Sequence, residues 1–333
     1  MSKAKTSILL RITNGKVHSL ITCLLIFIGL GTVLSLIFIV EGIAFVQNNY
    51  GFFAHFGIAF VYIIFVTRLI HNVHVRDFHK LLGYSGLAEK EQGEWRDKIA
   101  NHRSQLVETL VAICVGILHA YLQGFVRIFD GTSKFLLYDV WASLHIIVLW
   151  VLITLSTSIF IRNMTLMNEL SQKLTIDLLN MDKFVSLTRS GVWSILAFIG
   201  AYSILFIRGF DSISSINLAD PAILVLGPSV FWMIRTPLKG FRKRVIEEKR
   251  REMAIIDAAI EGDHEILKKS RIGANLSNIN VIDLISYKRI IQNTFEIPIN
   301  IPVASRFIFY LIIPILTWIA ASMVDKVIDY LIK

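Results

Sequence analysis

Histidine is the residue type of this chain whose chemistry stands out, because several of the nine histidines fall within long apolar stretches. Ionisable side chains are costly inside a bilayer, and imidazole is a ligand of haem iron. If each apolar stretch is a membrane-crossing helix, three histidines from the second, third and fourth stretches share one level: His55, His119 and His145. Two of these three histidines are candidate axial ligands for a single b-type haem held between facing helices.

A pair of stacked haems fits the histidine spacing poorly. Two ligands on one helix should share a face, yet His55 and His71 are separated by about 4.4 helical turns, which points their rings to nearly opposite sides. The interpretation that we favour for the membrane histidines is simpler. Each is expected to hydrogen-bond a neighbouring helix or to lie at head-group depth, without a cofactor.

Other catalytic patterns are missing from the sequence, which has no P-loop, GxSxG, HExxH or CxxC motif. We therefore predict no catalytic residue and no metal site. A proton-coupled transporter usually buries a carboxylate near the midplane, whereas four carboxylates lie here at the ends of the apolar stretches: Glu41, Glu108, Asp139 and Asp325. An enzyme acting on lipid would need a polar cluster at head-group depth, where the sequence offers His71, His74 and Asp77.

The composition of the chain indicates a membrane protein. Of 333 residues, 54% are hydrophobic and only 18% are charged, whereas soluble domains carry about 25% charged residues. The charged residues are clumped between seven apolar stretches, each a candidate for the roughly 20 residues that cross a bilayer. These predicted spans are residues 20–40, 52–70, 110–126, 140–161, 192–207, 222–234 and 307–324. The sixth is short and contains Gly227 and Pro228, so six or seven spans are expected.

The loop charges give this map an orientation. With the N-terminus in the cytoplasm, all but five of the 34 lysines and arginines fall on the cytoplasmic side, as the positive-inside rule requires. The exceptions are Arg127, Lys134, Arg208, Lys326 and Lys333. The asymmetry accounts for the net charge of +9 without a nucleic-acid partner.

The chain divides into three regions: a transmembrane helical bundle over 1–235, a basic helical cytoplasmic segment over 236–305, and a C-terminal transmembrane helix over 306–333. A helix is predicted from about Leu238 to Ile260, continuing from the sixth span, with Ile246, Met253, Ile256 and Ile260 on one face. Its basic residues could bind anionic lipid, although ordinary positive-inside charge is the interpretation that we favour. They are Lys239, Arg242, Lys243, Arg244, Lys249, Arg250 and Arg251.

The end of the chain carries a recognisable pattern. It includes Phe295-Glu296-Ile297-Pro298, then Arg306-Phe307, a run from Tyr310 to Pro314, Trp318, and Val324-Asp325. This pattern resembles the tail of uncharacterised bacterial multi-span membrane proteins, except that the tryptophan expected before Pro298 is missing. The resemblance covers about a tenth of the chain. It implies a bacterial inner membrane and says nothing about activity.

The sequence therefore predicts an all-α polytopic membrane protein of six or seven spans with a cytoplasmic N-terminus. Its function is expected to be non-enzymatic, as a channel, a transport accessory or a membrane signalling component. A channel stays among these alternatives because hydroxyl groups can line a pore, and the fourth predicted span carries four of them: Thr154, Ser156, Thr157 and Ser158. The alternative is a b-type haem redox protein. The expected partners are the bilayer, anionic lipids at the cytoplasmic face, and a second copy or another membrane protein.

Overall fold

The computed structural model describes residues 10, 19–43, 47–100, 105–122, 134, 136–206, 221–270, 280–298 and 305. Within these residues every regular element is a helix, which confirms the predicted all-α class, and one isolated β-bridge joins Ser85 to Leu174. The long elements are α2 (Ser19–Glu41), α3 (Gln47–Leu82), α4 (Glu89–Ala100), α5 (Leu106–Leu122), α6 (Leu136–Ser171), α7 (Val185–Phe206), α8 (Pro221–Ile260) and α9 (Val281–Asn293). Two short 3₁₀ helices, η2 (Met181–Phe184) and η5 (His264–Lys269), precede α7 and follow α8.

Four stretches of the described chain are long and apolar enough to cross a bilayer: Ile21–Glu41, Gly57–Leu82, Leu136–Ser171 and Met181–Ala201. They contain most of the first, second, fourth and fifth predicted spans. The third predicted span falls in α5, a shorter apolar helix, and its last residues lie outside the described part. The sixth falls in the first half of α8, and the seventh, 307–324, lies outside the described residues.

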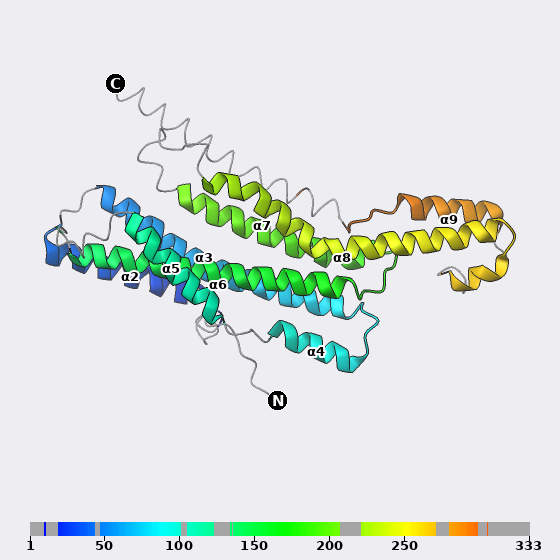
Figure 1. Ribbon diagram of the computed structural model, residues 1–333, viewed down its shortest axis with the longest axis horizontal. Helices are drawn as coiled ribbons and strands as arrows, with labels where there is room; N and C mark the ends of the chain where they lie inside the picture. Colours follow the sequence, from blue (N-terminus) through cyan, green and yellow to red (C-terminus); the bar gives the residue numbers. More distant parts are fainter. Residues whose placement is uncertain are drawn as a thin grey trace, which may run out of the picture.

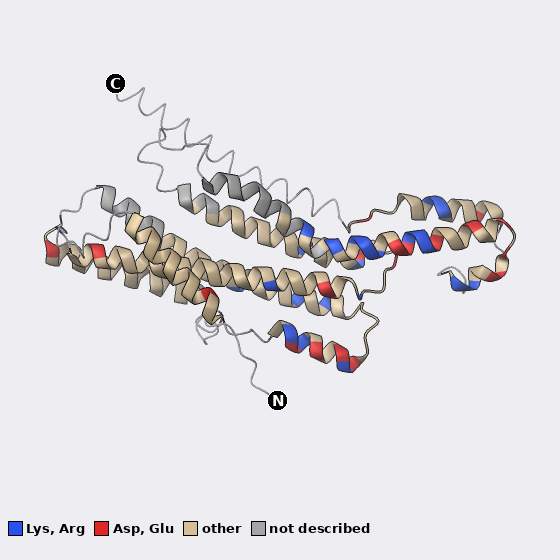
Figure 2. Cartoon of the chain, viewed as in Figure 1, with Lys and Arg blue, Asp and Glu red and all other residues tan. Residues whose placement is uncertain are grey.

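Three helices are longer than a bilayer crossing requires. Helices α3 and α6 have 36 residues each and α8 has 40, which at 1.5 Å per residue corresponds to about 54–60 Å, against a hydrocarbon core of about 30 Å. Helix α8 runs without interruption through Gly227 and Pro228 and ends at Ile260, as predicted for its basic half. Figure 1 shows α8 extending beyond the bundle, and Figure 2 shows the lysines and arginines gathered on it and on α4.

Helices α3 and α6 lie parallel, in a register fixed by two hydrogen-bonded pairs. Thr67 contacts Ser156 and His74 contacts Asn163, and each pair is 89 residues apart in sequence. With this offset, the outward-facing residues of both helices change from apolar to polar at the same level. On α3 the change lies between Leu69 and Arg76, and on α6 between Ile161 and Glu169. We call this level the boundary of the bundle.

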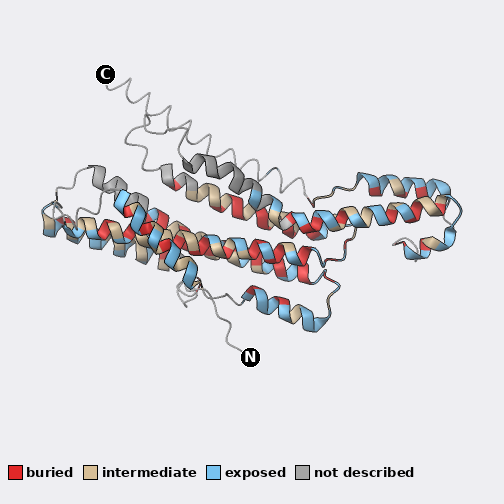
Figure 3. Ribbon diagram, viewed as in Figure 1, coloured by how far each residue is buried: buried red, intermediate tan, exposed pale blue. Residues whose placement is uncertain are grey.

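Figure 3 shows buried residues along α3, α6, α7 and α8, and in the described residues they form separate apolar clusters on the two sides of the boundary. On the bundle side, two small apolar clusters hold α2, α3, α5 and α6 together, including Phe60 and Ile159 in one and Phe38 and Trp141 in the other. Beyond the boundary, one larger cluster packs α3, α4, α6, α7, α8 and α9 around buried residues such as Phe78 and Phe241. Ile256 of α8 is buried in this cluster, and Met253 and Ile260 pack against it, as predicted. Ile246, the fourth residue of the predicted face, is not part of the cluster, and its neighbour Val245 is buried there instead.

Candidate functional site

Nine polar residues of α3, α6 and α7 meet at the boundary, and we call this group the polar seam. On α3 they follow the spacing of one helix face, so the helix directs them all toward α6 and α7. The members are Thr67, His71, His74 and Asp77 of α3, Ser156 and Asn163 of α6, and Arg189, Ser190 and Ser194 of α7. Seven of them are buried, and His71 and Arg189 are half-buried.

The strongest contact of the seam is an ion pair between Asp77 and Arg189. The Asp77 side chain is fully buried, and Arg189 donates to both carboxylate oxygens, from Nε to Oδ2 at 3.0 Å and from an Nη atom to Oδ1. Ser190 Oγ lies 3.4 Å from Oδ2, and the exposed Arg76 places its Nε 3.7 Å from Oδ1. The buried carboxylate is thus fully compensated, as a charge in this position must be.

His74 is fully buried and uses both ring nitrogens within the seam. Asn163 Nδ2, which is a donor, lies 3.3 Å from His74 Nδ1 and 3.2 Å from His71 Nδ1. His74 Nδ1 therefore accepts, so its proton is assigned to Nε2, which lies 3.2 Å from the Ser190 carbonyl and 3.1 Å from Ser194 Oγ. Because both nitrogens are paired, His74 acts as a link between three helices.

The seam ends toward the bundle at a hydroxyl pair. Thr67 Oγ1 donates to the Ile63 carbonyl at 2.6 Å and accepts from Ser156 Oγ at 2.7 Å. Past this pair the interior is the apolar cluster that contains Phe60 and Leu152. The polar groups therefore stop at an apolar layer inside the bundle.

A residue next to the seam in sequence contacts the segment that follows α9. Thr188, next to Arg189, donates to the Pro298 carbonyl at 2.8 Å. Arg242 of α8 pairs with Glu296 at 2.7 Å within the same segment. A displacement of α7 at the ion pair would therefore act directly on residues 294–298.

The three histidines predicted as haem ligands meet different surroundings. His55 lies in α3, level with Leu144 by the register of the two helices, and its side chain lies outside the described part. His119 Nδ1 accepts a hydrogen bond from Trp150 Nε1 at 2.8 Å. His145 is buried against Trp141, whose carbonyl is 2.9 Å from His145 Nδ1. The described residues show no contact between His119 and His145.

His145 keeps one nitrogen unused. Its Nε2 is buried and has no hydrogen-bond partner in the described structure. The ring lies between Trp141, with centroids 3.6 Å apart, and Phe60, with centroids 5.4 Å apart. No group of three or more histidine, cysteine, aspartate or glutamate residues that could hold a metal ion occurs in the described part of the chain.

The predicted lipid-binding residues of α8 divide into two sets. Arg242 and Lys249 hold the end of α9: Arg242 pairs with Glu296, and Lys249 Nζ donates to the carbonyls of Gln292 and Thr294 at 3.0 and 2.9 Å. The others lie along the helix, where three of them pair locally with Glu247 or Glu248: Lys243, Arg244 and Arg251. Lys239 and Arg250 are exposed.

Sequence reasoning placed His71, His74 and Asp77 at one depth but missed their partners. From the sequence, Arg189 counts only as one of the charges of a cytoplasmic loop, and Asn163 has no predicted role. The signal lay in the spacing, because Thr67, His71, His74 and Asp77 repeat at helical intervals on one face. Comparisons of the chain with protein-family models, with curated proteins and with solved structures found no match. The function must therefore be argued from these residues.

Proposed function

We propose that this chain is a non-enzymatic multi-pass protein of a bacterial inner membrane that acts as a membrane signalling component. In this proposal a change in the bundle moves the polar seam, and the seam passes the movement to α8 and α9. The observation that supports it most is the buried Asp77–Arg189 pair at the boundary, next to the contact from Thr188 to Pro298. Buried polar networks of this kind have few alternative arrangements, which suits a two-state link.

The proposed topology has six or seven spans and a cytoplasmic N-terminus. It is supported by the charge asymmetry of the sequence and by the position of the basic half of α8 beyond the boundary. In this orientation the exposed basic residues Lys239 and Arg250 face the cytoplasm, where they attract the head groups of anionic lipid.

The apolar interior of the bundle fits a signalling role better than it fits ion conduction. A pore needs a polar or hydrated route across the bundle. The seam instead stops at Thr67 and Ser156, and the layer beyond contains Phe60, Ile64 and Leu155. These residues are well placed to transmit packing changes and poorly suited to stabilise an ion.

The proposal is tested by hydrogen exchange of the protein in lipid nanodiscs. Asp77→Asn removes the negative charge of the ion pair with little change of side-chain shape, and we expect faster amide exchange in residues 281–298. Thr188→Val, which removes only the contact to Pro298, should reproduce the effect there without altering α3. Glu169→Gln, an exposed carboxylate on α6, is the matched control and should behave as wild type. Unchanged exchange at 281–298 in both variants would refute the coupling.

A b-type haem protein remains the second candidate, and one observation favours it. The buried Nε2 of His145 has no partner among the described residues, and it lies on the level of His55. An optical spectrum of the purified protein decides between the two. The signalling proposal expects a colourless preparation, whereas a reducible Soret band that disappears in His145→Ala would establish the haem.

A further inference from the structure

Helices α5 and α6 cross at a point set by small residues. Ala112, Gly116 and Ala120 lie on one buried face of α5, and a Cβ added to Gly116 would lie 2.7 Å from the Ile147 Cα atom. The two backbones therefore touch at Gly116, as small residues at four-residue intervals allow. Away from this contact the helices separate, and Figure 1 shows α5 running obliquely across α6.

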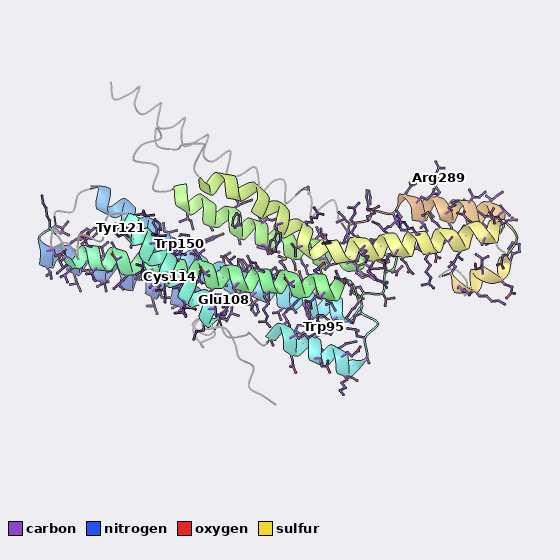
Figure 4. All side chains as sticks on the ribbon, viewed as in Figure 1. Trp95, Glu108, Cys114, Tyr121, Trp150 and Arg289 are labelled. Atoms are coloured by element: carbon purple, nitrogen blue, oxygen red, sulfur yellow. The ribbon has the colours of Figure 1, made fainter. Side chains whose placement is uncertain are left out.

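A groove opens between the two helices on the side of the crossing that faces the boundary. Its volume is about 630 Å³, within the range of small-molecule sites. One wall is formed by Gln105, which precedes α5, and Glu108 of α5, and the α6 wall runs from Trp150 to Arg162. Glu108 and Trp150 are labelled in Figure 4. Helix α5 presents exposed apolar residues beside it, such as Val107, 69% exposed, so the groove opens toward lipid.

The hydroxyl groups in this groove differ from others in the apolar helices. Thr32, Ser35, Ser143 and Thr165 each donate to the carbonyl four residues earlier. Three hydroxyl residues line the groove, and within the described structure they donate to no protein acceptor: Thr154, Thr157 and Ser158. A hydroxyl group without a partner is costly in a bilayer, so a polar group of a ligand is expected beside them.

Opposite charges face the same groove. Glu108 of α5 and Arg162 of α6 both line it, and no ion pair joins them in the described structure. Arg162 is held in place by a hydrogen bond to the Lys98 carbonyl of α4. A ligand that offers an anion to Arg162 and the hydroxyl groups, and a cation with N–H donors to Glu108, matches the side chains of both walls.

We propose that this groove is a binding site for an aminophospholipid, with the phosphate toward Arg162 and Ser158, the ammonium toward Glu108, and an acyl chain along Ile153 and Trp150. The site is separate from the polar seam and does not depend on the proposed signalling function. Phosphatidylcholine has the same net charge but no N–H donor, so Glu108 should discriminate against it.

The test uses Trp150, which lines the groove and is fixed by its hydrogen bond to His119. The full chain is reconstituted in phosphatidylcholine vesicles that contain a small fraction of phosphatidylethanolamine brominated on the acyl chain, which quenches tryptophan on contact. The part of the fluorescence quenching that is lost in Trp150→Phe reports lipid bound in this groove. The converse vesicles carry brominated phosphatidylcholine in phosphatidylethanolamine. We expect the brominated amine lipid to be preferred about tenfold, the factor that one charge-assisted hydrogen bond supplies.

Variants assign the preference to the residues. Glu108→Gln should remove the preference for the amine lipid, and Arg162→Gln should weaken quenching by both lipids. Thr165→Val, which alters a threonine of α6 outside the groove, should leave both unchanged. Equal quenching of the wild-type Trp150 by the two lipids would overturn the proposal, as would a preference that survives in Glu108→Gln or stronger quenching by brominated phosphatidylglycerol.

Discussion

The two sides of the boundary expose opposite kinds of side chain over apolar interiors. On the bundle side the outward residues are apolar, and the interior consists of the two apolar clusters that contain Phe60 and Phe38. Beyond the boundary the interior is one apolar cluster around Phe78 and Phe241, and α8 exposes many charged residues. Because α3 and α6 are continuous across the boundary, the change of surface reflects what surrounds each turn of helix and not a change of fold. The polar seam lies at the level where the surface changes.

The largest expected effect is at the seam. Asp77→Ala leaves the half-buried Arg189 without its partner, and removing one member of a buried pair costs about 3–5 kcal/mol of unfolding free energy. Denaturant unfolding in a defined detergent measures this cost. Asp77→Leu combined with Arg189→Leu should recover most of it, because the uncompensated charge is gone. A loss below about 1 kcal/mol in Asp77→Ala would mean that the pair contributes no more than a surface ion pair.

The comparison is sharpened by two isoleucines with the same exposure. Ile28 of α2 and Ile285 of α9 are both 53% exposed. Ile28→Asp should cost about 2.5–3.5 kcal/mol of membrane insertion, whereas Ile285→Asp should change stability by about 0.5 kcal/mol or less. A glycosylation-based insertion assay measures the first and thermal unfolding the second. Similar effects at both positions would remove the distinction between the two sides.

A smaller effect is expected where α3 and α7 touch. Tyr62 Oη donates to the Ala197 carbonyl at 2.8 Å, and a Cβ on Gly200 would overlap that hydroxyl and lie 2.7 Å from Tyr62 Cζ. Gly200→Ala should therefore cost about 1–3 kcal/mol through overpacking and the lost hydrogen bond. Gly29→Ala, where a Cβ meets nothing within 4 Å, is the matched control for thermal unfolding. An unchanged melting temperature in Gly200→Ala would contradict the close contact.

The smallest expected effect concerns the end of α9. Lys249 Nζ holds two carbonyls at its C-terminus, so Lys249→Ala should cost about 0.5–1.5 kcal/mol locally. Amide exchange in the last turn of α9 measures it, with the exposed Arg250→Ala as control. If both variants exchange alike, Lys249 contributes only general positive charge.

Much of the fold could be predicted from hydropathy, and less of the site. Apolar runs and the basic stretch of α8 predict helices and their ends, because each is a pattern of residues close together in sequence. The end of α8 at Ile260 was predicted correctly. The partners Arg189 and Asn163 could not be assigned, since the register between α3, α6 and α7 is a tertiary property. The same holds for the groove, which depends on the crossing at Gly116. The sequence marks the histidines as candidates by residue type alone, whereas His74 links three helices through its contacts with Asn163, Ser190 and Ser194.

The most direct test of the account is the side of the membrane on which the basic second half of α8 lies. In a background with Cys23 and Cys114 replaced by alanine, single cysteines at Arg250→Cys and Lys134→Cys mark the two faces of the bundle. A membrane-impermeant maleimide should label Lys134→Cys in intact cells, and Arg250→Cys only in inside-out vesicles. Labelling of Arg250→Cys from outside intact cells, or of both positions from the same side, would contradict a bundle that crosses the membrane and leaves its basic helix in the cytoplasm.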